Sequence, residues 1–119
     1  MICLMTSIWN VIVRRRHMEK TTAQKIREWA KERNLDVADP AKQMVKLIEE
    51  VGELASGMSK LNYPLIKDSI GDAYVVLTIL AMQYSMDIEF CIDTAWEEIK
   101  NRKGKTINGV FVKEGDLLK

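Results

Sequence analysis

Apolar side chains recur at helical spacing along most of this chain, and the longest such series lies between residues 40 and 61. The positions follow an i, i+3, i+4, i+7 pattern for four turns, which predicts an amphipathic helix. Its apolar members are Met44, Leu47, Ile48, Val51, Leu54, Ala55 and Met58. Asp39-Pro40 supplies an N-cap and a first helical residue, and Asn62-Tyr63-Pro64 breaks the series. The sequence therefore predicts a helix between these two segments.

Two further segments on either side of it are also predicted to be helical. One runs from a cap at Thr21 or Thr22 to about Arg33. Its inner stripe consists of Ile26, Trp29 and Ala30. The other begins at Pro64 and is apolar on nearly every side from Ile70 to Met82, which predicts a buried helix.

A last helix is predicted to begin at the N-cap Asp87 and to end at Gly104. The residues expected on its core-facing side are Ile88, Cys91, Ile92, Ala95, Trp96 and Ile99. The segment TINGVFVKEGD then places an Asn-Gly turn between short β-type runs, which favours a small hairpin or extended arm. The predicted fold class is therefore all-α, a four-helix bundle with a short C-terminal extended arm or hairpin.

Length and charge narrow the class of protein. A chain of 119 residues is long enough for one core and one domain. Its net charge of +1 is unevenly spread, because Arg14, Arg15 and Arg16 are three of the 18 basic residues and every acidic residue lies at Glu19 or later. Without those arginines, 15 basic residues face 17 acidic ones, a net charge of −2. This balance argues against nucleic-acid binding, which needs a basic patch.

Cysteine and histidine usage excludes several kinds of site. Cys3 and Cys91 are isolated and form no CxxC motif, so a reducing cytoplasm is the expected compartment. The single histidine, His17, excludes most His-rich zinc sites and the Glu-x-x-His pairs of di-iron bundles. It also leaves no Ser-His-Asp or Cys-His constellation.

The N-terminal segment MICLMTSIWNVIV is apolar and is followed by RRRH. It is shorter than the roughly 20 residues of a spanning helix, and its charges follow the apolar run instead of preceding it, unlike a secretory signal. We expect residues 1–17 to be an appendage or a misassigned start, and residues 18–119 to form the helical domain. A peripheral membrane or partner contact of 1–17 is the alternative, although no membrane partner is predicted for the domain.

Carboxylates are the candidate chemistry of the chain. Glu49, Glu50 and Glu53 lie on the helix after Asp39, on an arc away from its apolar stripe, where a solvated face would be the ordinary explanation. Asp72 is harder to explain, because it enters the apolar run of the next helix and that helix supplies no basic residue between Asp68 and residue 87. A buried aspartate needs a cation or hydrogen bonds. Oxygen-only ligands favour Mg²⁺ or Mn²⁺, and with them phosphoryl chemistry.

Glu49-Glu50-x-x-Glu53, a spacer and a carboxylate-containing turn that ends in Gly71-Asp72 resemble the EExxE…ExxD signature of the MazG-like, all-α nucleoside triphosphate pyrophosphohydrolases. The resemblance extends from Met18 to the closing EIKNRKGKTINGVFVKE, as in short phage- or Firmicute-type members. It implies Mg²⁺-dependent hydrolysis of an NTP or dNTP to the monophosphate and pyrophosphate. It also implies a dimer or a dimer of dimers.

Position by position, the resemblance makes Glu50, Glu53 and Asp72 metal ligands, and Glu49 a further ligand or the group that orients the attacking water. One position departs from the pattern, because Ser69 stands where the signature has glutamate. Asp68 lies one residue earlier and four before Asp72, so it can take over as a ligand, and the number of metal ions stays open.

Substrate contacts can also be suggested from the residues. Lys100, Arg102, Lys103 and Lys105 are candidates for the outer phosphates, although basic residues at a helix C-terminus equally well complement the helix dipole. Trp29 could stack on the base, but an aromatic residue on an amphipathic stripe more often belongs to the core.

Two other classes of function stay open at this point. The first is a non-catalytic helical oligomerisation module with an acidic, solubilising face, and the second is a regulator that binds nucleotides without cleaving them. The surroundings of Asp72 separate the module from the enzyme: a module would pair Asp72 with Lys or Arg, whereas an enzyme would place it opposite Glu50 and Glu53 across an open gap. The departure at Ser69 is what keeps the regulator open. We also expect a homodimer or homotetramer, since one chain has too few helices to cover the helix that spans residues 70–82.

Overall fold

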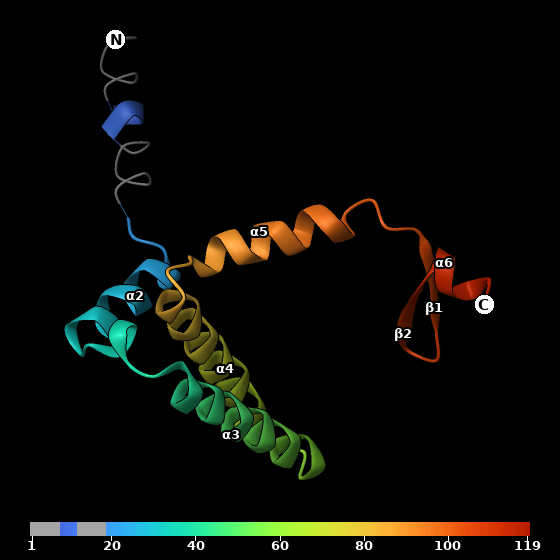
Figure 1. The fold of residues 1–119 in the computed structure, drawn as a ribbon, viewed down its shortest axis with the longest axis horizontal. Coiled ribbons are helices and arrows are strands. Elements are labelled where there is room, and N and C mark those ends of the chain that lie inside the picture. The colour runs from blue at the N-terminus through green and yellow to red at the C-terminus, as the bar shows by residue number, and fades with distance from the viewer. Residues whose placement is uncertain (1–7, 12–18) are drawn as a thin grey trace.

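The computed structural model describes residues 8–11 and 19–119, and most of this part of the chain is helical (Figure 1). The long helices are α2 (Thr22–Glu32), α3 (Pro40–Ser59), α4 (Tyr63–Gln83) and α5 (Ile88–Ile99). The short elements are the 3-10 turn η1 (Leu35–Val37), the antiparallel strands β1 (Gly104–Ile107) and β2 (Val110–Lys113), and α6 (Glu114–Leu117). The predicted helical character and the small C-terminal hairpin are both confirmed.

Residues 8–11 form one helical turn, and the remainder of the predicted extension at 1–17 lies outside the described residues. Its assignment as an appendage therefore stays a prediction. No single helix in the described ranges is long and apolar enough to cross a membrane, while the bent pair α4 and α5 passes that test by length and composition alone.

The helix starts follow local capping chemistry. Thr21 forms a capping box with Gln24, in which the Gln24 N–H donates to the Thr21 hydroxyl at 3.2 Å and the Thr21 N–H donates to the Gln24 side chain at 2.8 Å. Asp39 and Asp87 cap α3 and α5 by accepting backbone N–H bonds at 2.9 Å. These contacts depend on neighbouring residues only, which is why the sequence located the helix starts well.

The antiparallel pair α3 and α4 makes the most extensive contact between two helices in the described part of the chain (Figure 1). Gly57 is buried in the seam between them, and a Cβ atom there would lie 3.2 Å from the backbone nitrogen and Cγ1 of Ile66. The missing side chain lets the two helices approach closely at their connected end. Counting in opposite directions from this contact puts Glu50 level with residues 72–73 of α4.

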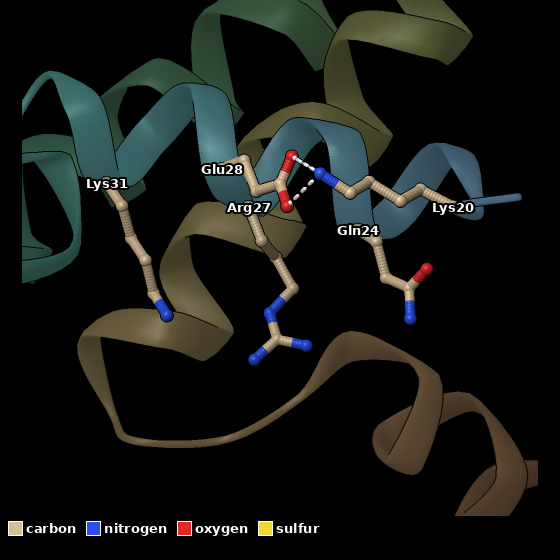
Figure 2. Close-up of a pocket in the computed structure, with 5 residues that line it drawn as sticks. All are labelled: Lys20, Gln24, Arg27, Glu28 and Lys31. Atoms are coloured by element: carbon tan, nitrogen blue, oxygen red, sulfur yellow. Dashed lines mark hydrogen bonds and ion pairs between the residues drawn. The ribbon is translucent and has the colours of Figure 1, made fainter. Parts of the chain in front are cut away.

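Helix α2 crosses the later part of α4 and fixes the turn that leads to α5. Ala23, Ala81 and Ile88 form a small buried cluster, against which Tyr74 and Cys91 pack. The Arg27 guanidinium donates to the Asp87 carboxylate at 2.7 Å across this junction. Figure 2 shows Arg27 extending from α2 toward the turn, with the Lys20–Glu28 ion pair beside it.

Helix α5 then leaves the other helices, at a bend of 102° from α4 (Figure 1). Ile88 is buried, but Ile92, Trp96 and Ile99 are about half exposed. The prediction that Trp96 lies in the core is therefore wrong for the single chain, because no helix within residues 8–11 and 19–119 neighbours α5 beyond its first turn. The four long helices do not close into a bundle within one chain.

The predicted inner stripe of α3 is also displaced. Leu47 and Leu54 are half-buried, whereas Met44, Ile48, Val51 and Met58 are exposed, as are Ile70 and Leu77 on α4. The side of α3 that meets α4 is rotated from the centre of the stripe toward the glutamates. Helix α4 is consequently not buried on all sides, contrary to the prediction from its composition.

Candidate functional site

Glu50 lies in the seam between α3 and α4 instead of on a solvated arc. Its residue exposure is 8%, and its Oε2 atom is buried without a hydrogen-bond partner in the structure. The side of α3 that carries it also carries Leu54 and Gly57, which are partly or fully buried against α4. The expectation that the glutamates point away from the packed side of α3 is therefore wrong for Glu50.

The electrostatic surroundings of Glu50 link the two acidic segments. Burial raises the pKa of the Glu50 carboxyl, and the nearby carboxylates of Glu53 and Asp72 raise it further. Lys46 acts in the opposite direction from 3.7 Å. Three of the carboxylates predicted to act together are thus close enough to influence one another across the seam.

Asp72 makes no ion pair with any residue in the described part of the chain. It is only half-buried, and its charge acts on Glu50 from the neighbouring helix. The lysine or arginine ion-pair partner expected in a purely structural module is therefore not found for Asp72 among the described residues. Two lysines line the hollows that Asp72 borders, Lys25 in one and Lys67 in the other.

Ser69 and its neighbour Asp68 face different surroundings. It is fully buried in the seam, and its hydroxyl has no hydrogen-bond partner among the described residues. Asp68 instead faces outward and lines an open hollow of about 330 Å³ with Gly71 and Asp72. The substitute carboxylate therefore lies on the same side as Asp72, whereas the position that departs from the signature points into the seam.

Glu49 and Glu53 differ in their surroundings. Lys46 donates to Glu49 at 2.7 Å, and both side chains are about half exposed. This hydrogen bond, with the charge of Glu49, raises the pKa of Lys46. Glu53 has no such partner among the described ion pairs and contributes to the field at Glu50. Glu49 is consequently the member of the predicted ligand set that is not linked to Glu50 and Asp72, because its carboxylate binds Lys46 instead.

A second hollow adjoins the carboxylates between α2 and α4. It has a volume of about 430 Å³ and is lined by Lys25, Ile26, Trp29, Asp72 and Val75. Trp29 is 45% exposed, so it is not the fully packed core residue that its amphipathic stripe suggested. Its outer side contacts the Arg33 guanidinium, 4.3 Å from the ring centroid. The Trp29 ring and Asp72 thus line the same hollow.

Lys25 is a member of this hollow that sequence reasoning missed. It precedes Trp29 by four residues, so the two share one face of α2. That spacing could have indicated that Lys25 accompanies Trp29, but the sequence does not show that this face of α2 lies beside Asp72.

The predicted phosphate-binding residues are not brought to the acidic seam. Lys100, Arg102, Lys103 and Lys105 lie at the end of α5 and the start of β1, which extend away from α3 (Figure 1). Lys100 pairs with Glu97 on its own helix. Within one chain, these cations are separated from the carboxylates that they were expected to accompany.

The acidic side chains of the seam differ in how well their arrangement and their chemistry suit a metal ion. Within 8–11 and 19–119, no three acidic, histidine or cysteine side chains converge into a ready metal-binding group. The donor chemistry nevertheless suits a hard cation, because the available groups are carboxylate oxygens and one buried oxygen of Glu50 has no partner. Glu50, Glu53 and Asp72 are the residues that could hold such a cation.

The hollow on the outer face of α2 has a different character. Lys20, Gln24, Arg27, Glu28 and Lys31 line a space of about 270 Å³ (Figure 2). Most of its charges are satisfied locally, since Lys20 pairs with Glu28 and Arg27 pairs with Asp87. We assign it a structural role in holding the turn before α5.

Comparison with known proteins finds a phage relative. Over 63 residues the chain is 52% identical to an uncharacterized 18.2 kDa protein in the rep-hol intergenic region of Haemophilus phage HP1. The match takes in 52% of this chain and 39% of the phage protein, so it spans about two fifths of that relative's length. No family model matches the sequence, and no solved structure matches it.

Proposed function

We propose that this protein is an Mg²⁺-dependent nucleoside triphosphate pyrophosphohydrolase of the MazG-like type, with Mn²⁺ as a possible substitute and with the cytoplasm as its compartment. The observation that carries the proposal is the buried Glu50 carboxylate, which shares its surroundings with Glu53 and Asp72 while Asp72 has no basic partner. A protein gains nothing in stability from this gathering of like charges. A ligand that brings positive charge would explain it.

The groups of the chain divide the work in the following way. Bound at Glu50, Glu53 and Asp72, Mg²⁺ would neutralise phosphate charge and lower the pKa of the attacking water. Glu49 would accept the proton of that water once its ion pair with Lys46 had opened. Asp68 would add a ligand from the open side of Asp72.

The nucleobase has a natural place in the hollow between α2 and α4. Trp29 and Ile26 offer apolar surface for a planar ring, and Lys25 and Asp72 offer polar contacts at its edge. A volume of about 430 Å³ is within the range of small-molecule sites. The base and the triphosphate would thus meet at Asp72.

The test is a panel of NTPs and dNTPs incubated with the purified protein and Mg²⁺. We expect release of pyrophosphate, not orthophosphate, from at least one nucleotide, and no release in EDTA. Absence of turnover across the whole panel, with the helical fold verified by circular dichroism, would refute the enzymatic proposal.

Nucleotide binding without cleavage is the second candidate, favoured by the seam-facing Ser69 where the family signature has a carboxylate. Calorimetric binding of an NTP in the presence of Mg²⁺ with no turnover would support it. A helical oligomerisation module, the third possibility, would bind no nucleotide under the same conditions.

A further inference from the structure

The C-terminal arm, residues 88–119, has an apolar side that the described part of its own chain does not cover. Beyond Cys91 every residue of α5 is exposed, including Ile92, Trp96 and Ile99 at helical spacing. The hairpin that follows packs with α6 and lies away from α3 (Figure 1). An amphipathic helix in this state has the pattern of a packed element without a packing partner.

A second uncovered surface lies on the α3–α4 pair. We call it the apolar face, and it consists of Met44, Ile48, Val51, Met58, Ile70 and Leu77, which are 40–61% exposed. At 100° per residue the four α3 positions fall within one narrow arc, and antiparallel packing puts Ile70 and Leu77 on the same side of the pair. The carboxylates of the candidate site lie toward the opposite side. Contiguous apolar surface of this kind is typical of protein–protein contact.

The dimensions of the chain agree with a missing partner. Its radius of gyration is 20.1 Å, whereas a compact domain of this length has about 13–14 Å. Part of the excess arises because α5 and the hairpin extend outward instead of folding back, and the turn at residues 8–11 also lies away from α2, α3 and α4 (Figure 1).

We propose that two copies of this chain exchange their C-terminal arms, each packing the apolar side of α5 on the apolar face of the other. The occupant is a second copy because both halves of the contact are present once in every chain. A two-fold arrangement therefore covers both arms and both apolar faces together, and it closes without leaving further surface to polymerise.

Charge complementarity supports the same arrangement. Residues 100–113 contain five basic residues and no acidic ones. The candidate site offers five carboxylates, with Lys46 as their described ion-pair partner. Arg102 and Lys103 lie between the end of α5 at Ile99 and the start of β1 at Gly104. Four residues of chain span up to about 13 Å, and a layer one helix thick measures about 10 Å. The segment that follows α5 in an exchanged arm can therefore bring Arg102 and Lys103 past the edge of the α3–α4 pair to the partner's carboxylates.

The exchange has a consequence for the site, and this part depends on the proposed function. Arg102 and Lys103 of one copy would bind the outer phosphates held at Glu50 and Asp72 of the other. The apolar contact itself does not depend on any activity, so the two parts can fail separately.

Light scattering on the full chain tests the association. We expect a dimer for the natural sequence, and a monomer for Ile48→Asp and for Ile92→Asp. Both side chains are exposed in the single chain, so the fold should survive, as circular dichroism would verify. Val37→Asp is the matched control, because Val37 is exposed but lies on neither surface. A monomeric natural chain, or a dimer that resists both substitutions, would overturn the proposal.

Cysteine cross-linking tests the exchange itself. In a background with Cys3→Ser and Cys91→Ser, Ile48→Cys and Ile92→Cys chains are prepared separately, mixed to exchange subunits, and oxidised. We expect a covalent dimer in the mixture and none in either single preparation. A covalent dimer from Ile48→Cys alone would show that two α3–α4 pairs pack face to face, and it would contradict arm exchange.

Subunit complementation tests the shared site once activity has been detected. A Glu50→Gln chain is mixed with a chain that carries Arg102→Glu and Lys103→Glu, each inactive alone. Random pairing gives half hetero-dimers with one intact site each, so about one quarter of natural activity should return. No recovery despite cross-linking would remove the phosphate-binding role and leave the interface in place, whereas recovery without cross-linking would place the arms elsewhere.

Discussion

The body of the molecule (α2, α3 and α4) and the C-terminal arm are built from similar amphipathic patterns, yet they differ in what those patterns bury. In the body, α4 is contacted by both other helices and supplies the buried residues Val76, Ile79 and Ala81. In the arm, only Ile88 is buried, at the point where α5 leaves α4. An apolar stripe therefore predicts that one side of a helix is buried, but it does not predict whether the covering residues come from the same chain.

The same comparison explains the distribution of charge. The body concentrates carboxylates in and beside its seam, including the buried Glu50, and the arm concentrates cations after α5. Each region therefore carries an excess of one sign of charge, negative at the seam and positive after α5.

The largest effect is expected at the seam. Glu50→Gln, Glu53→Gln and Asp72→Asn should each lower the rate of pyrophosphate release at least about a hundredfold, because each removes charge that would hold Mg²⁺. Steady-state kinetics at saturating nucleotide measures this loss. Glu32→Gln, an exposed substitution on α2, is the control and should leave the rate unchanged. Unchanged activity in all three seam variants would separate the seam from catalysis.

A core substitution should distinguish the packed region from the unpacked one. Ala30 is fully buried, so Ala30→Leu should destabilise the fold by about 1–3 kcal/mol through overpacking. Ala95 is exposed on α5, and Ala95→Leu should cost less than about 0.5 kcal/mol. Both are made in the Ile48→Asp chain to keep copies apart, and urea unfolding measures them. Equal costs would mean that α5 packs on its own chain.

The pH dependence of stability should report on Glu50. Because burial and neighbouring carboxylates raise its pKa in the folded state, the folded chain binds this proton more tightly than the unfolded chain. Its contribution to stability is complete below the ordinary pKa of 4.5 and is lost as pH rises through the raised value. In EDTA, Glu50→Gln should therefore lose less stability than the natural chain between pH 4 and pH 8 in urea titrations. Identical profiles would mean that Glu50 is effectively solvated.

The smallest effect concerns the junction between the two regions. Asp39→Ala and Asp87→Ala each remove a helix N-cap worth about 1 kcal/mol, but only Asp87 also binds Arg27. The difference between the two losses in unfolding free energy should be about 0.2–1 kcal/mol, the usual range for a partly exposed ion pair. Equal losses would show that the Arg27 contact does not hold α5 in place.

The sequence determined the elements through local chemistry. Caps at Thr21, Asp39 and Asp87 act over two or three residues, so the starts of α2, α3 and α5 could be predicted within the chain itself. The Asn108-Gly109 turn has positive φ at both residues, 50° and 79°, as the predicted hairpin requires. The acidic candidates could also be selected, because an aspartate in an apolar run is costly wherever that run is buried.

Only the tertiary structure decided which side of each helix is covered. The stripe on α3 predicted a core through Val51, but the contact with α4 is rotated toward Glu50, because Gly57 permits close approach on that side. The stripe on α5 predicted a buried Trp96, but the turn at Asp87 directs the helix away from α2, α3 and the body of α4. Helical periodicity fixes an apolar direction to within an arc, whereas packing depends on the positions of other helices, and those are set by contacts between residues far apart in the sequence.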